Sequence, residues 1–191
     1  MWNRLIGTAA VAAAVLAASQ TAQASSLGGS TAGYIVAGQP TLAPFAYVRF
    51  CLTFPGECAV SQGLSSVELG SSTLRQLASV NGLVNSRIHP VEDASTDVGD
   101  VWQVGVASGD CEEFALTKRR NLIALGWPSR ALRIAVARTG SGEGHAVLVV
   151  KTSRGDLVLD NRTDEIKPWT QTDLRWVKIQ SGDNPRLWYT M

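Results

Sequence analysis

The sequence predicts an α+β fold in which helices come first and an antiparallel β-sheet follows. Residues 110–125 carry apolar side chains at helical spacing, and four strand-like runs lie downstream of them. Because the loops between successive runs are short, we expect neighbouring strands to be antiparallel. The N-terminal helices would then pack on one face of this sheet.

Residues 1–24 have the pattern of a secretory signal peptide. Arg4 precedes an apolar stretch at residues 5–18, and Ala22-Gln23-Ala24 forms a small-residue cleavage site. This stretch is short for a membrane span, and no later run approaches its length, although an uncleaved anchor is the alternative. We therefore expect cleavage after Ala24 and an exported protein without stable membrane insertion.

The charge balance argues against nucleic acid or an anionic membrane as a general partner. The chain has 17 basic and 16 acidic side chains. Removing residues 1–24 removes Arg4 and no acid, so the formal net charge of the remainder is zero. A neutral protein lacks the positive field that such polyanions require.

The three cysteines are an odd number for an exported protein. Cys51 and Cys58 are close in sequence around a Pro-Gly turn, so we expect them to form a disulfide in an oxidising compartment. Cys111 is then a free thiol, either functional or buried and inert. Residues 25–43 are expected to form a flexible mature N-terminus, and residues 44–191 the domain.

The first long helix is expected at residues 72–88, with Ser71 or Ser72 as its N-cap. His89-Pro90 ends it, and we assign His89 a surface or capping role. Residues 92–109 indicate an irregular acidic loop from which Trp102 packs into the core. The helix positions expected to face inward are Leu74, Leu77, Asn81, Val84 and Ile88.

The second helix, at residues 110–125, begins next to Cys111 and ends before Gly126, a favourable C-terminal residue. Cys111 lies on its inward face with Phe114, Ala115, Leu122 and Leu125. Lys118 falls in the same stripe, and we expect its ammonium group to reach solvent. The thiol therefore lies at the positive end of the helix dipole.

The strand-like runs are residues 131–138, 144–151, 156–160 and 174–180. His145 opens the second run and Asp160 ends the third, with a turn at residues 153–155 between them. This hairpin would bring the two side chains to the same end of neighbouring strands.

Cys111, His145 and Asp160 together have the residue types of a thiol active site. A helix N-terminus and an imidazolium stabilise a thiolate nucleophile, and the imidazole later protonates the leaving amine. A carboxylate holds the imidazole in one orientation. For the oxyanion we consider the backbone N–H of Cys111 and a side-chain N–H of Trp102 or Gln103. The alternative for Trp102 is a core aromatic.

Three acids flank the thiol and would oppose its ionisation. Asp110 and Glu113 have the spacing of a capping box, whereas Glu112 has no such role. Calcium, which prefers oxygen ligands, would neutralise the excess charge. Adjacent acids at the start of a helix are also common without a metal.

Several ordered blocks resemble the bacterial transglutaminase-like cysteine peptidases, which include the LapG-type periplasmic proteases. The resemblance covers roughly residue 45 to the end of the chain. The blocks are Val80-Asn81, Val84-Asn85-Ser86-Arg87-Ile88, Asp100-Val101-Trp102, Gly109-Asp110-Cys111-Glu112-Glu113-Phe114-Ala115, Lys118-Arg119, Gly126-Trp127-Pro128, Leu132-Arg133-Ile134, Gly144-His145-Ala146-Val147-Leu148 and Leu157-Val158-Leu159-Asp160-Asn161.

This resemblance implies a papain-like fold, a triad of Cys111, His145 and Asp160, and a periplasmic location. It also implies calcium held by Asp110 and Glu112. LapG-type members have Asp-Cys-Glu-Asp where this chain has Asp-Cys-Glu-Glu, so Glu113 departs from the pattern. Those members cleave a surface adhesin and are restrained by an inner-membrane receptor that senses cyclic-di-GMP; one sequence reveals neither partner.

The first functional hypothesis is an exported cysteine endopeptidase that hydrolyses a protein or peptide. The second keeps the site but transfers the acyl group to an amine, or acts as an amidase on peptidoglycan stems. The third is a catalytically silent module that binds a peptide in its groove. Residues 92–109 and 139–144 are expected to form the rim of this groove.

Overall fold

The computed structural model describes residues 33–91 and 100–191. In these residues seven strands form one antiparallel sheet in the order β1-β9-β8-β4-β5-β6-β7. The strands are β1 Pro40–Thr41, β4 Leu132–Arg138, β5 Gly144–Thr152, β6 Gly155–Leu159, β7 Lys167–Pro168, β8 Arg175–Gln180 and β9 Trp188–Thr190.

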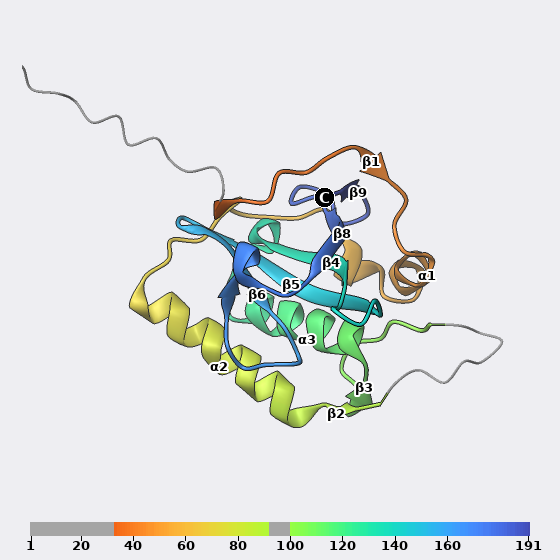
Figure 1. The fold of residues 1–191 in the computed structure, drawn as a ribbon, viewed down its shortest axis with the longest axis horizontal. Helices are drawn as coiled ribbons and strands as arrows, with labels where there is room; N and C mark the ends of the chain where they lie inside the picture. Colours follow the sequence, from red (N-terminus) through yellow and green to blue (C-terminus); the bar gives the residue numbers. More distant parts are fainter. Residues whose placement is uncertain (1–32, 92–99) are drawn as a thin grey trace, which may run out of the picture.

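The helices precede the main strands, as predicted. They are α1 Phe45–Thr53, α2 Ser71–Arg87 and α3 Cys111–Ala124, with short 3₁₀ turns η2 Pro55–Cys58, η3 Ser129–Ala131 and η4 Trp169–Gln171. Two further short strands, β2 His89–Pro90 and β3 Ser108–Gly109, pair in parallel before α3. Helix α3 packs against the sheet, mainly on β5, and α2 packs on α3 (Figure 1).

The sheet has an apolar core on each face. Along β5, Leu148 and Val150 belong to the cluster shared with the helices, whereas Val147 and Val149 belong to a second cluster. This alternation is the period of a strand buried on both faces. Trp169 and Trp176 pack against the second cluster. The predicted α+β fold is confirmed.

The predicted elements agree with the observed ones to within about a residue at most ends, but the start of α2 differs. Gly70 is its N-cap, and neither Ser71 nor Ser72 caps it. Instead, the hydroxyl of Thr73 accepts a hydrogen bond from the Gly70 N–H at 2.8 Å. Leu74 is 44% exposed, so the inward face of this helix begins at Leu77.

The chain joins the sheet before residue 44, so the predicted flexible segment 25–43 is too long. Ile35 is buried, and its N–H donates to Asp156 Oδ2 at 2.7 Å. Strand β1 pairs with β9. The composition of this segment could not reveal these contacts, because their partners lie more than 100 residues away. Residues 1–32 lie outside the described structure.

The cysteines follow the predicted arrangement. Cys51 of α1 and Cys58 of η2 form a disulfide, and Cys111 is a free thiol. No helix in the described ranges has the length and apolarity needed to cross a membrane.

Lys118 differs from its prediction. Its side chain does not reach solvent but is fully buried. Nζ lies 5.9 Å from the ring centre of Phe114. Helical spacing places Lys118 on the inward face correctly, but it does not show that packing closes over the whole side chain.

Candidate active site

The start of α3 fixes the position of Cys111. Asp110 is the N-cap, and its carboxylate accepts a hydrogen bond from the Glu112 N–H at 3.4 Å. In return, Glu113 Oε2 accepts from the Asp110 N–H at 3.0 Å. This reciprocal arrangement is the predicted capping box. It leaves Cys111 as the first residue of the helix, where backbone N–H groups and the helix dipole favour an anion.

Glu113 is also joined to the chain that approaches the helix. Its side chain is buried, and Oε1 accepts from the Gln103 N–H at 2.7 Å. A Cβ atom on Gly109 would lie within 2.7 Å of the Glu113 side chain, so a larger residue would clash there. Both oxygens of Glu113 therefore bind backbone N–H groups, which explains its burial.

His145 and Asp160 lie together, as the hairpin geometry predicts. The pairing of Leu148 with Leu159 brings the beginning of β5 beside the end of β6. His145 Nε2 then lies 2.8 Å from Asp160 Oδ1, and both side chains are buried. Burial raises the pKa of the Asp160 carboxyl, but hydrogen bonds from His145 and Arg162 outweigh burial and hold the pKa below its usual range.

Cys111 and His145 line the same cleft, which has a volume of about 530 Å³. Thr139 and Glu143 lie on its wall, as expected for the 139–144 rim. The prediction that residues 92–109 form the other rim is not confirmed for residues 100–109. Residues 100–109 do not line the cleft, whereas Pro90 and Val91 do. Residues 92–99 lie outside the described ranges.

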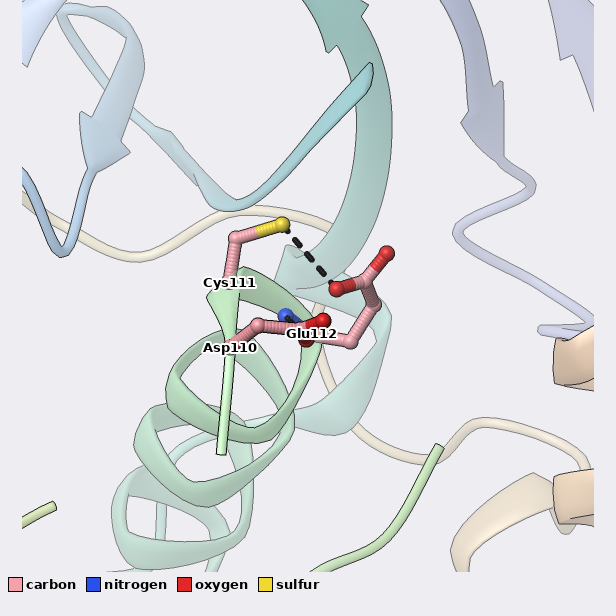
Figure 2. A group of neighbouring side chains, drawn as sticks. All are labelled: Asp110, Cys111 and Glu112. Atoms are coloured by element: carbon pink, nitrogen blue, oxygen red, sulfur yellow. Dashed lines mark hydrogen bonds between the residues drawn. The ribbon is translucent and has the colours of Figure 1, made fainter. Parts of the chain in front are cut away.

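The Cys111 sulfur makes two hydrogen bonds. Sγ donates to Glu112 Oε2 at 3.0 Å and accepts from the Ala146 N–H at 3.3 Å. Figure 2 shows the bond to Glu112 at the beginning of α3. Burial, and then the neighbouring Glu112, raise the pKa of the Cys111 thiol well above its usual range. Burial and the neighbouring acids therefore favour a neutral thiol.

Asp110, Cys111 and Glu112 form a cluster with metal-ligand character. Each offers one ligand atom, and the three atoms lie within 4.8 Å of one another (Figure 2). Burial, followed by the neighbouring Asp110, raises the pKa of Glu112 to about 9. Two acids at such a distance repel each other, and a divalent cation between them would relieve the repulsion.

The predicted side-chain donors to an oxyanion do not reach the cleft. Trp102 is a buried core residue, and its Nε1–H donates to Asp100 Oδ2 at 2.8 Å. Gln103 is exposed, and neither residue lines the cleft. The alternative for Trp102, a core aromatic, is therefore correct. The prediction failed because closeness to Cys111 in sequence does not determine where the side chains of an irregular loop point.

His89 lies at the surface, as expected, on β2. The sequence interpretation missed Arg162 and the backbone N–H of Ala146. Arg162 follows Asp160 by two residues, a spacing at which a backbone N–H commonly turns back to an Asp side chain. That spacing was the available signal for Arg162; the Ala146 contact depends on packing between α3 and β5.

The geometry agrees with the similarity of the chain to known proteins. Residues 37–191 match the family model described as bacterial transglutaminase-like cysteine proteinase BTLCP. No curated protein sequence matches the chain.

Solved structures of Legionella pneumophila LapG are also similar. The calcium-bound form is 30% identical, with a TM-score of 0.54, and the match covers 61% of this chain and 68% of that one. The EGTA-treated form is 24% identical, with a TM-score of 0.50, and the match covers 77% and 78%. The second likeness supports the fold alone.

Proposed function

We propose that this chain, which belongs to the bacterial transglutaminase-like cysteine proteinases, is an exported calcium-dependent endopeptidase that acts through Cys111, His145 and Asp160. Family membership makes it a cysteine peptidase. The observation that carries the assignment of these residues is the 2.8 Å contact between His145 and Asp160 beside the cleft that Cys111 and His145 share.

Each of the three residues has one role in this proposal. Asp160 binds Nε2 of His145, so that Nδ1 is the nitrogen that exchanges a proton with the Cys111 thiol. The thiolate attacks the peptide carbonyl, and the imidazolium then protonates the leaving amine. Water, deprotonated by the same imidazole, hydrolyses the acyl-enzyme and regenerates the thiol. The Ala146 N–H, 3.3 Å from Sγ, would stabilise the thiolate.

Asp110 and Glu112 fit the role of calcium ligands. Their donor atoms are carboxylate oxygens, which this ion prefers, and they lie within one cluster. Glu113 does not fit, because both its oxygens accept from backbone N–H groups. A bound cation would offset the negative charge that, after burial, favours the neutral thiol. The LapG structure described as calcium-bound adds support from a relative.

The proposed location is the periplasm, reached through the signal peptide at residues 1–24. The proposed substrate is an exported surface protein. An adhesin is the substrate class that the LapG-type resemblance favours, and an inner-membrane receptor is the corresponding regulator. Both proposals rest on the resemblance and on the signal-peptide pattern.

The experiment compares the mature wild-type protein with Cys111→Ala on exported surface proteins, with calcium or with EGTA. New N-termini identified by mass spectrometry are expected with the wild type and calcium only. Cleavage by Cys111→Ala would contradict the assignment of the nucleophile. Equal cleavage in EGTA would contradict calcium dependence, and incorporation of an added amine without new N-termini would favour acyl transfer.

A further inference from the structure

Asp160 accepts hydrogen bonds on both carboxylate oxygens, and three of them come from Arg162. The Arg162 backbone N–H donates to Oδ1 at 2.9 Å, while Nε and Nη2 donate to Oδ2 at 3.0 and 2.8 Å. We propose that Arg162 is a positioning residue that holds the Asp160 carboxylate in the orientation required by His145. This inference rests on the proposed peptidase function.

The local chain explains how one residue makes all three bonds. Asp160 directly follows β6, and the chain turns so that the Arg162 N–H points back to Oδ1. The guanidinium is planar, and two of its N–H groups converge on Oδ2. Oδ2 is therefore occupied by arginine, while Oδ1 also binds His145. Rotation of the carboxylate would break several charged hydrogen bonds at once.

Asp173 provides the second anchor of Arg162. Nη2 and Nη1 donate to its two oxygens at 2.7 and 3.2 Å. Asp173 lies before β8, so the pair joins two separate segments. Exposure of the side chains rises from 7% for Asp160 to 34% for Arg162 and 66% for Asp173. Because such an exposed pair contributes little to stability, we assign it to the orientation of the arginine.

The charges around Asp160 agree with this arrangement. Among the described residues, the charged or ionisable groups that interact with buried Asp160 include His145, Arg162, Asp173 and Lys118 of α3. Asn85 of α2 contacts Asp160 through the backbone carbonyl, to which its Nδ2 donates at 3.2 Å, and the same Nδ2 also donates to Thr163 O and Asp164 Oδ1. Without Arg162, the carboxylate loses its main directional partner besides the histidine.

The test compares Arg162→Met, Arg162→Lys and Asp173→Asn with wild type, using Arg154→Met in the β5–β6 turn as the matched control. For Arg162→Met we expect kcat to fall about 10- to 100-fold, because small misplacements of a catalytic group have effects of this size. KM should change less than about threefold, since the arginine is already paired with acids. Arg162→Lys should recover part of kcat, and Asp173→Asn should lose a few-fold.

Alkylation of Cys111 by iodoacetamide provides a readout that does not depend on substrate binding. Its rate should fall in parallel with kcat in the Arg162 variants and stay at the wild-type value in Arg154→Met. A wild-type kcat in Arg162→Met, or a loss confined to KM with unchanged alkylation, would overturn the proposal.

A folding defect is recognised by circular dichroism. If Arg162→Met does not fold, Arg162→Lys and Asp173→Asn decide the matter, and wild-type kcat in both would overturn the inference. Cleavage by wild type and none by Cys111→Ala tests the peptidase proposal independently. A failure of the Arg162 proposal is thereby distinguished from a failure of the peptidase proposal.

Discussion

Lys118 lies in an environment that is unusual for a lysine. Its side chain is fully buried, and Nζ has no hydrogen-bond partner among the described residues. Burial lowers the pKa of Lys118 from 10.5 to about 7, opposed by the charges of Asp160 and Asp164. A buried ammonium without hydrogen bonds is costly. Between about pH 7 and pH 10.5, this pKa predicts a neutral Lys118 in the folded protein and a charged one in the unfolded chain.

This difference in protonation predicts a pH-dependent stability. Between about pH 7 and pH 10.5 the unfolded chain binds more protons at Lys118, so the wild-type free energy of unfolding should rise with pH from this site. Lys118→Met removes this pH-dependent contribution to the free energy of unfolding. The stability of Lys118→Met relative to wild type should therefore fall by up to about 1.4 kcal/mol per pH unit in this range.

Urea unfolding at pH 7.5 and 9.5 measures the difference. Lys167→Met, which removes a partly exposed lysine, is the control and should keep a constant offset from wild type. An equally constant offset for Lys118→Met would show that Lys118 does not change its protonation on folding.

In the first turn of helix α3, two neighbouring acids have different roles. Glu113 holds two backbone N–H groups, whereas Glu112 binds the thiol and belongs to the metal-ligand cluster. Glu113→Ala leaves both N–H groups without their carboxylate and opens a cavity. We expect it to lower the free energy of unfolding by about 2–3 kcal/mol, measured in urea with EGTA.

Calcium should distinguish Glu112 from Glu113 in the same measurement. A ligand that binds only the folded state stabilises it by about 2.7 kcal/mol at a concentration 100 times its dissociation constant. Glu113→Ala should retain the calcium-dependent rise in melting temperature, and Glu112→Gln should lose it. If Glu112→Gln keeps the full rise, Glu112 is not a ligand.

Local patterns were sufficient to predict α2, α3, the four longer strands and the pairing of His145 with Asp160, but they did not predict α1. Each depends on periodicity or on a short hairpin, and these act over short stretches of chain: His145 and Asp160 are only 15 residues apart. The positions of Trp102 and Gln103 depend on how an irregular loop packs, which periodicity does not determine. The spacing from Asp160 indicated the backbone contact of Arg162, but the pairing of its side chain with Asp173 forms only in the folded protein.

Across the fold, the two ends of the described domain pack against each other. Strand β9 lies between β1 and β8, so residues near 40 and 190 share one sheet edge (Figure 1). Trp188 of β9 is buried and packs edge-on against Tyr47 of α1, with 5.3 Å between ring centres. These contacts span more than 140 residues, so no local pattern indicates them.

Trp188 therefore links α1, the sheet edge and the C-terminus, and Trp188→Ala should lower the free energy of unfolding by about 3–5 kcal/mol. Leu187→Ala, one residue earlier and 51% exposed, is the control and should change it by less than about 0.5 kcal/mol. The cleft lies between α3, β5 and the β6 end, on the other side of β4 and β8 from β9. Below its own unfolding transition, Trp188→Ala should thus alkylate Cys111 at the wild-type rate. A slower rate in the folded variant would show that this edge also determines the geometry around the thiol.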